Sequence, residues 1–229
     1  MKTILVVGAM KAGTSTLHYL LARHSRICAG REKELDFFRR DAPPAAYRKL
    51  FPNLDPERHL YRLDSSPNLS KRPRFGGVPR RLKRFPGKLR IYYVLRDPVH
   101  RLHSHVQHNL ARGRWQPDAI TDEHLEMCVE ASCYAYQLDA FARAGLKVEL
   151  LDFDELVAEP AGLVYRMQES LGLERETVEQ SPRPRNVSPG KIEAAYSIEH
   201  FLPRLRRDTE RLIEEYGFAP GAAWSHLHS

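Results

Sequence analysis

The sequence predicts a single α/β domain over residues 1–229, with a central parallel sheet flanked by helices. Short apolar, β-branched runs alternate with helical patterns along the chain, and this alternation is typical of a parallel sheet that is covered on both faces. A chain of 229 residues with 42 % apolar content is also long enough to bury one full core. No internal repeat or low-complexity tract indicates another architecture.

The predicted strands and helices come in pairs along the chain. Each apolar run precedes a stretch with helical periodicity, which predicts three strand–helix pairs. They are a strand at 3–7 with a helix at 15–23, a strand at 89–95 with a helix at 99–110, and a strand at 147–153 with a helix at 155–171. A weaker strand is predicted at residues 60–64 and a last helix at 198–216. Residues 111–122 are polar and contain Gly and Pro, so we predict a surface loop, a kind of segment that often carries specificity.

The cysteines and the hydropathy pattern predict a cytoplasmic protein. The three cysteines, Cys28, Cys128 and Cys133, are an odd number at spacings that match no zinc or haem pattern, so we expect reduced thiols. The first apolar run ends after five residues in a glycine turn, which indicates a strand rather than a signal peptide. No stretch reaches the eighteen or so uncharged apolar residues of a membrane span, and none is expected.

The charge favours anionic ligands. The formal net charge is +7, and nine of the twenty residues at 71–90 are basic. Only Phe75 and Phe85 could stack on bases there, and no nucleic-acid signature accompanies them. We therefore expect a solvated basic helix with flanking loops in this stretch, and no nucleic-acid partner.

The stretch VVGAMKAGTST resembles a phosphate-binding loop with its lysine displaced. Gly8 and Gly13 have the spacing of the nucleoside-triphosphate loop, yet the lysine is Lys11 rather than the residue after the second glycine. A strand that feeds a glycine turn and then a helix aims backbone N–H groups and the positive end of the helix dipole at one point. The loop is therefore predicted to bind an anion, with further hydrogen bonds from the hydroxyls of Thr14, Ser15 and Thr16.

A second anion site is predicted at the end of another strand. The stretch IYYVLRDP places Arg96 where a triphosphate site would have a metal-binding aspartate. Ser104 follows eight residues later, two turns into the next helix, so its hydroxyl could approach the same anion. The dinucleotide fingerprint G-x-G-x-x-G is absent, which argues against a nicotinamide or flavin site.

These paired motifs resemble the sulfotransferases that use 3′-phosphoadenosine 5′-phosphosulfate (PAPS). MKAGTST corresponds to the family's 5′-phosphosulfate loop, and RDPVHRLHS to its 3′-phosphate site. EKELDFF, residues 32–38, is similar to the E-x-x-F-F signature of the branch with the heparan sulfate N- and O-sulfotransferases and bacterial relatives, and residues 150–173 also match. The resemblance implies a P-loop NTPase-like sulfotransferase fold and transfer of a sulfuryl group from PAPS to a hydroxyl or amine of a carbohydrate or small-molecule acceptor. The product would be adenosine 3′,5′-bisphosphate, and no metal is implied.

The resemblance also implies roles for particular residues. Lys11 would neutralise the charge that develops on the leaving phosphate, and Glu34 would be the general base that takes the acceptor's proton. The remaining implied residues bind the donor: Ala12, Gly13, Thr14, Ser15 and Thr16 in the loop, Arg96 and Ser104 at the 3′-phosphate, and Arg185 in the basic stretch 183–191.

The general base and the cation near the sulfonate each have more than one candidate. Glu32, His59 and His105 are alternatives to Glu34 as the base. In addition, several eukaryotic relatives have a lysine that contacts the sulfonate region where this chain has Ser65. Either Lys11 then carries more of the charge neutralisation, or Lys71 or Arg72 reaches in from downstream.

Two other functions remain as alternatives. One is an ATP- and magnesium-dependent kinase for a small molecule or nucleotide, with Asp97 or Asp64 as the metal carboxylate. The other is a polyanion-binding module without catalysis that uses the basic stretch 71–90. The histidines at 100, 103, 105 and 108 fall on two faces of a helix and match no metal motif, so no metal site is expected there.

Overall fold

The computed structural model describes residues 1–180, 182, 190, 192–221, 224 and 227. In these residues the chain forms a parallel sheet of five strands in the order β2-β3-β1-β4-β5. The strands are β1 (Lys2–Gly8), β2 (Ile27–Ala29), β3 (Tyr61–Ser65), β4 (Leu89–Leu95) and β5 (Val148–Asp152). The predicted α/β fold with a central parallel sheet is confirmed.

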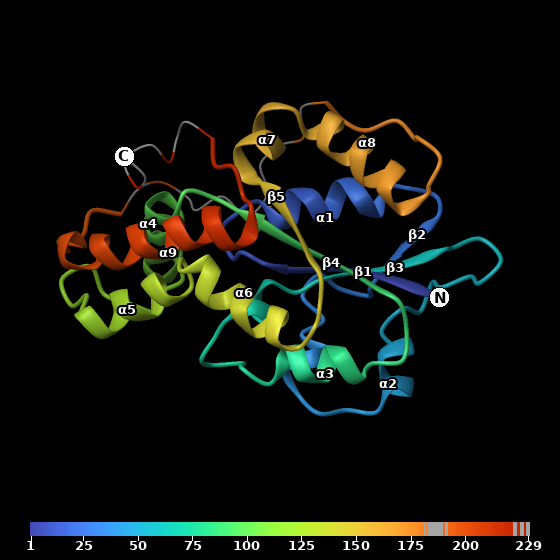
Figure 1. The fold of residues 1–229 in the computed structure, drawn as a ribbon, viewed down its shortest axis with the longest axis horizontal. Coiled ribbons are helices and arrows are strands. Elements are labelled where there is room, and N and C mark those ends of the chain that lie inside the picture. Colours follow the sequence, from blue (N-terminus) through green and yellow to red (C-terminus); the bar gives the residue numbers. More distant parts are fainter. Residues whose placement is uncertain (181, 183–189, 191, 222–223, 225–226, 228–229) are drawn as a thin grey trace.

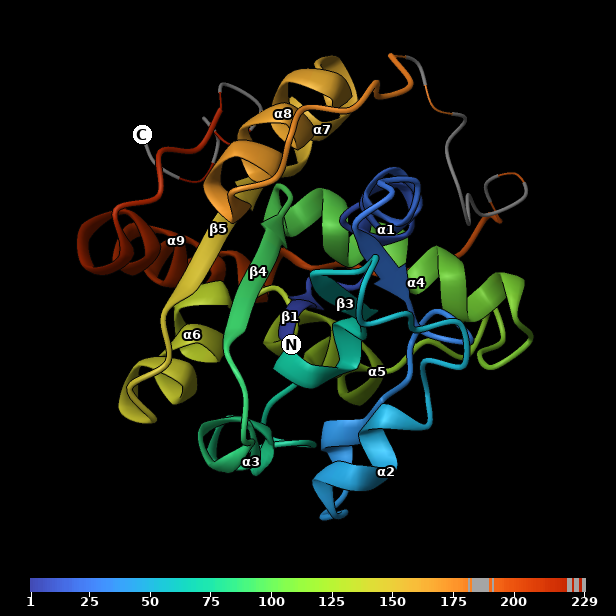
Figure 2. The ribbon, with the colours of Figure 1, turned by 90° about the vertical axis from the view of Figure 1, so that its right-hand side faces the viewer.

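Helices cover both faces of the sheet and its carboxyl edge (Figure 1). On one face lie α1 (Thr14–Ala22), α7 (Phe153–Ala158) and α8 (Pro160–Leu171), and on the other lie α3 (Val78–Arg84) and α6 (Tyr134–Arg143). Beyond the ends of β1 and β4 gather α4 (Pro98–Ala111), α5 (Asp122–Glu130) and α9 (Leu202–Tyr216). The short helix α2 (Pro44–Arg48) lies at the opposite end of the molecule, near the start of β1 (Figure 2).

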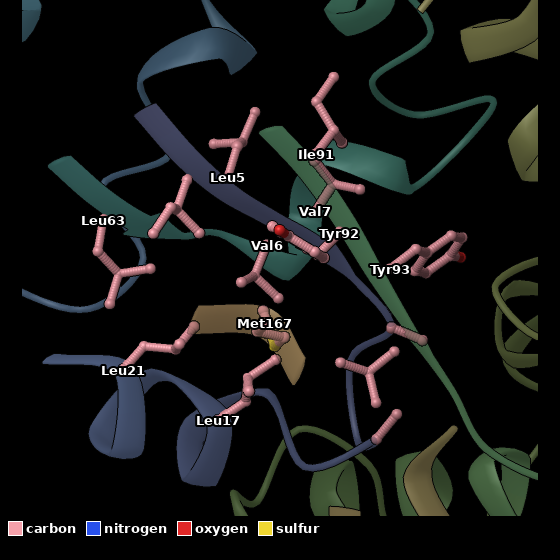
Figure 3. Packing of buried hydrophobic residues seen from close by; sticks show 14 of the residues in the cluster. Leu5, Val6, Val7, Leu17, Leu21, Leu63, Ile91, Tyr92, Tyr93 and Met167 are labelled. Carbon is pink, nitrogen blue, oxygen red and sulfur yellow. The ribbon is translucent and has the colours of Figure 1, made fainter. Parts of the chain in front are cut away.

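The two central strands β1 and β4 are apolar over most of their length because both faces of the sheet are covered. In β1 every residue from Thr3 to Gly8 is buried. Leu17 and Leu21 of α1 and Met167 of α8 pack with Val6 and Leu63 on one face of the sheet (Figure 3). This packing fixes α1, and with it the loop between β1 and α1, against the sheet.

The order of the strands creates a crevice at the carboxyl ends of β1 and β4. These two strands are neighbours, yet the chain leaves β1 toward β2 on one side of the sheet and leaves β4 toward β5 on the other. Ligands of open α/β sheets bind at such a switch point. The phosphate loop follows β1 and Arg96 follows β4, so the fold brings the two predicted anion-binding segments together.

Several boundaries differ from the sequence predictions. The helix predicted over residues 155–171 is two helices, because Glu159 adopts a non-helical conformation (φ −140°, ψ 60°) and Pro160 has no N–H to continue the first helix. The last helix begins at Leu202 rather than at residue 198, after a 3₁₀ turn at Glu199–Phe201. The sequence did not indicate the short edge strand β2 or helices α5 and α6.

Two further sequence predictions, the loop and the reduced cysteines, agree with the structure. Residues between α4 and α5 form the predicted loop, and the three cysteines are buried free thiols. Among the described helices, none is both long and apolar enough to cross a membrane. A second hydrophobic cluster joins α4, α5 and α9 through Leu102, Val129 and Leu205.

Candidate functional site

A cavity of about 1230 Å³ lies at the carboxyl ends of the strands. It is lined by residues from the phosphate loop, the start of α1, the segment before the 3₁₀ turn Phe37–Arg39, the end of β4 and helix α4. Most residues selected from the sequence line it together: Lys11, Gly13, Thr14, Ser15, Thr16, Glu34, Arg96 and Ser104. Ala12, within the loop, is buried and does not line the cavity, and Arg185 lies outside the described residues.

The phosphate loop takes its shape from two glycines. A Cβ on Gly8 would lie 2.2 Å from Cε2 of Tyr93, so the aromatic ring can pack over the end of β1 only because this residue has no side chain. Gly13 has a φ of 75°, in the left-handed region that glycine adopts without strain, and α1 begins at the next residue. The Ala12 amide donates to the Ala9 carbonyl at 3.1 Å. Ala12 therefore shapes the loop. At the start of α1 the Thr16 and Leu17 amides donate to the Gly13 carbonyl at 2.9 and 3.1 Å, and the amides before them belong to the helix end that has no intrahelical acceptor.

Arg96 is fastened directly to the phosphate loop. Its Nη1 donates to the Lys11 carbonyl oxygen at 3.0 Å, and its guanidinium lies 4.7 Å from the centre of the Phe153 ring. The Tyr134 hydroxyl donates to the Arg96 carbonyl at 2.7 Å. Burial lowers the pKa of Arg96, and burial followed by the charge of Arg96 lowers that of Lys11. Two cations are thus held close together in a partly desolvated place, where an anion would relieve their repulsion.

Arg101 supports the site from beneath the cavity, and the sequence indicated no role for it. It is fully buried, and its Nε donates to Ser132 Oγ at 2.7 Å. Its two terminal nitrogens donate to the Cys128 carbonyl at 2.5 Å and to the Met10 carbonyl at 3.3 Å. Arg101 therefore ties α4 and the end of α5 to the phosphate loop. The available signal was its place as the second arginine of the RDPVHRLHS stretch.

Glu34 reaches the cavity from a strained turn. Its φ is 68°, and its Oε1 accepts a hydrogen bond from Lys33 Nζ at 2.8 Å. Two residues later, the Asp36 amide donates to Ser66 Oγ at 2.9 Å, which attaches this segment to the end of β3. Among the described residues that line the cavity, Glu34 is the only carboxylate.

The alternative bases are placed differently. Glu32 pairs with Arg31 at 3.5 Å, is exposed, and does not line the cavity. His59 lines a separate cavity at the amino ends of the strands. His105 is buried beside Arg101, and burial holds its pKa well below the usual value. The geometry therefore favours Glu34.

Lys71 reaches the cavity, whereas Arg72 does not. Lys71 Nζ donates to the Met10 sulfur at 3.0 Å, and burial followed by the charge of Arg101 lowers the pKa of Lys71 to about 8. Arg72 instead turns toward α6, where its Nη1 donates to the Tyr136 carbonyl at 2.8 Å. Ser65 Oγ is 2.9 Å from His18 Nδ1 and does not line the cavity.

The cavity is strongly cationic. The described lining residues include eight lysines and arginines beside the single carboxylate of Glu34. These cations come from the phosphate loop, the turn around Glu34, the start of the basic stretch and both ends of α4: Lys11, Lys33, Arg39, Lys71, Arg74, Arg96, Arg112 and Arg114. Such a field suits a ligand with several negative charges.

Comparison with known protein families gives a match to the sulfotransferase domain over residues 1–183. The chain belongs to the sulfotransferase domain family. It is therefore an enzyme of the sulfotransferase class, and the resemblance noted in the sequence is confirmed. No curated protein matches the sequence significantly.

Solved sulfotransferase structures share the fold. A sulfotransferase from Alicyclobacillus acidocaldarius superposes with a TM-score of 0.73 at 20 % identity, covering 98 % of this chain and 99 % of that one. The sulfotransferase domain of the Synechococcus PCC 7002 olefin synthase gives a TM-score of 0.59 at 12 % identity, with 96 % and 95 % covered. The corresponding domain of the curacin biosynthetic pathway gives 0.57 at 12 % identity, with 96 % and 98 % covered.

The aspartates considered for a kinase have other partners in this sulfotransferase. Asp64 is buried and accepts hydrogen bonds from the Tyr47 hydroxyl at 3.1 Å and the Ser66 hydroxyl at 2.6 Å. Asp97 caps α4 by accepting from the His100 amide at 2.7 Å. Neither lines the cavity, and within the described part of the chain no group of three or more His, Cys, Asp or Glu residues could hold a metal ion.

Proposed function

We propose that this sulfotransferase transfers a sulfuryl group from PAPS to a hydroxyl or amine of a carbohydrate or small-molecule acceptor. The observation that carries the proposal is the hydrogen bond between Arg96 and the Lys11 carbonyl, which sets two cationic segments side by side in one cavity. PAPS has two separate anionic groups on one ribose, the 5′-phosphosulfate and the 3′-phosphate. The phosphate loop would take the first, and Arg96 with Ser104 the second.

The transfer breaks the bond between the sulfur and the bridging phosphate oxygen. The acceptor oxygen or nitrogen forms the new bond to sulfur, and adenosine 3′,5′-bisphosphate leaves with an additional negative charge. Lys11 would neutralise that charge, and amides at the start of α1 would bind the 5′-phosphate with the hydroxyls of Thr14, Ser15 and Thr16. Because these groups meet developing charge, they lower the barrier as well as binding the donor.

Lys71 would supply the second cation near the sulfonate. It lines the same cavity as Lys11, and its present acceptor, the Met10 sulfur, is a weak one. A sulfonate oxygen would be a stronger acceptor, and the ammonium would give up only the weak hydrogen bond to the Met10 sulfur on moving to it. Ser65 is bonded to His18, so Lys71 supports this role better than Ser65 or Arg72.

Glu34 would take the acceptor's proton as the new bond forms. It is the carboxylate of the described cavity lining, and general-base help of this kind is worth about 10²- to 10⁴-fold in rate. Its hydrogen bond with Lys33 must then be exchanged for one with the acceptor. Lys33 would remain close enough to orient the carboxylate.

The alternative functions have weaker support. A magnesium-dependent kinase would need an aspartate in the cavity, and Asp64 and Asp97 are hydrogen-bonded elsewhere. A pure polyanion-binding module would not need a carboxylate beside its cations.

The buried free thiols of Cys28, Cys128 and Cys133 support the expected location in the cytoplasm.

Calorimetric titration tests the donor. Adenosine 3′,5′-bisphosphate should bind with micromolar affinity in the presence of a metal chelator, and ATP with magnesium should bind at least about 100-fold more weakly. Preferential binding of ATP with magnesium would overturn the proposal and favour the kinase.

A further inference from the structure

A second cavity, of about 600 Å³, lies at the end of the molecule opposite the phosphate loop. It is formed where β1 and β3 begin, with Lys2 from β1, Arg62 from β3 and Arg48 from α2 in its lining. This is the end that faces the viewer in Figure 2, where α2 and the start of β1 lie. Parallel strands of five to seven residues separate it from the donor site, about 20 Å away.

Arg62 is a buried cation that forms no ion pair with any residue the structure describes. The residue is only 8 % exposed, and its Nε is buried without a hydrogen-bond partner. Its guanidinium lies 5.2 Å from the centre of the Tyr47 ring and 5.7 Å from that of Phe51. In the part of the chain that the structure describes, no carboxylate lies within ion-pair distance of it. Buried charges are normally paired, so this arginine is placed to receive an anion.

The neighbouring groups add to the positive potential. Arg48 is exposed at the mouth of the cavity, and Lys2 Nζ donates to the Tyr61 hydroxyl at 3.3 Å. His59 Nδ1 accepts from the Asp55 amide at 3.0 Å, which leaves Nε2 to carry the ring proton as a donor. No Asp or Glu is among the described lining residues.

The rest of the lining is apolar. Leu54, Pro56 and Leu60 form one wall of the cavity. Leu60 is 43 % exposed, so part of this apolar wall is open to a ligand. A ligand with an apolar body beside its anionic group would cover this surface as well as meet the cations.

We propose that this cavity is a second ligand site, which binds a small molecule with one phosphate or sulfate group and an apolar body. The anionic group would lie between Arg62 and Arg48, with Lys2 and the His59 ring N–H as further donors. The apolar body would lie against Leu54 and Leu60. The proposal does not depend on the donor site, because the two cavities share no lining residue.

The test follows the N–H resonance of Arg62 Nε by nuclear magnetic resonance while benzyl phosphate is added. The Nε–H group is buried, so its proton should exchange slowly with water, and Arg62→Lys assigns the signal. We expect a saturable shift with a dissociation constant of about 1 mM or lower, and about tenfold weaker binding of inorganic phosphate, which lacks the apolar body. Benzyl alcohol, which lacks the charge, should leave the resonance unmoved.

A pair of exposed variants supplies the control. Arg48→Ala removes a lining cation and should weaken benzyl phosphate binding about tenfold, whereas Lys49→Ala removes the adjacent exposed cation outside the lining and should not weaken it. Both substitutions are on the surface, so both variants should fold. The proposal is overturned if the Arg62 resonance does not saturate by about 20 mM benzyl phosphate, if benzyl alcohol shifts it equally, or if the two variants behave alike.

Discussion

Replacing Lys71 by arginine should move the alkaline limit of turnover to higher pH. Burial lowers the pKa of Lys71 to about 8, so about 90 % of the side chain is charged at pH 7 and only about 10 % at pH 9. If the ammonium must meet the sulfonate, kcat/KM for the donor should fall almost tenfold between these values. Arginine remains charged throughout this range, so in Lys71→Arg the decline should begin later.

The uncharged variant separates charge from packing. Lys71→Met keeps a long apolar side chain but loses the ammonium at every pH, so its kcat/KM should be lower by about 10² to 10³, the usual effect of removing one transition-state donor. The pKa of Lys11 is also lowered, so any fall in kcat/KM at alkaline pH that remains in Lys71→Arg would reflect deprotonation of Lys11. Lys88→Met, an exposed change in the same basic stretch and outside the cavity, is the matched control.

The assay measures release of adenosine 3′,5′-bisphosphate from PAPS between about pH 6.5 and 9.5, since kcat/KM reports the groups of the free enzyme. The carbon shift of Lys71 Cε, followed over the same range, gives its pKa directly. The reasoning is refuted if Lys71→Arg keeps the parent's alkaline limit, or if Lys71→Met and Lys88→Met turn over equally well.

Three further predictions concern the base and the stability of the fold. Glu34→Gln should lower turnover about 10²- to 10⁴-fold and leave the affinity for the bisphosphate near normal. Glu32→Gln, outside the cavity, should change neither quantity. Loss of bisphosphate binding in Glu34→Gln would mean that Glu34 has a structural role. Burial raises the pKa of Asp64 to about 6 from 3.8, so its contribution to stability is present at low pH and is lost as pH rises through 6. Denaturant titrations should therefore show the parent losing about 2 kcal/mol relative to Asp64→Asn between about pH 4 and 7, and parallel curves for the two proteins would contradict this. Gly8→Ala should cost about 1–3 kcal/mol of unfolding free energy, because the added Cβ would lie 2.2 Å from a Tyr93 ring carbon; equal denaturation midpoints would show that the ring can move away.

The sequence predicted the parts of the fold that local patterns determine. β1 and β4 are buried on both faces, so their apolar runs are continuous and easily recognised. The edge strand β2 has only three residues, and its position depends on pairing with β3, which local sequence does not encode. In the same way, Pro160 signalled a break that the helical periodicity on either side of it concealed.

For the site, the sequence predicted which segments would contribute but not which of their side chains would reach the cavity. It left Lys71 and Arg72 as equal candidates for the cation near the sulfonate. Only the packing distinguishes them, because Lys71 contacts the Met10 sulfur in the cavity and Arg72 donates to the Tyr136 carbonyl on α6. It also gave no role to Arg101, whose contacts come from residues far along the chain. Such tertiary contacts have no local signature.

The most direct test of the central claim, a donor with separate 5′- and 3′-anions, is the ratio of affinities for adenosine 3′,5′-bisphosphate and adenosine 5′-monophosphate. These nucleotides differ only in the 3′-phosphate, and calorimetry should show the bisphosphate binding at least about 100-fold more tightly to the parent. In Arg96→Ala the ratio should fall to within about tenfold, mainly through weaker binding of the bisphosphate. Equal affinity of the parent for both nucleotides, or an unchanged ratio in Arg96→Ala, would contradict the assignment of Arg96 to a 3′-phosphate and with it the proposed donor.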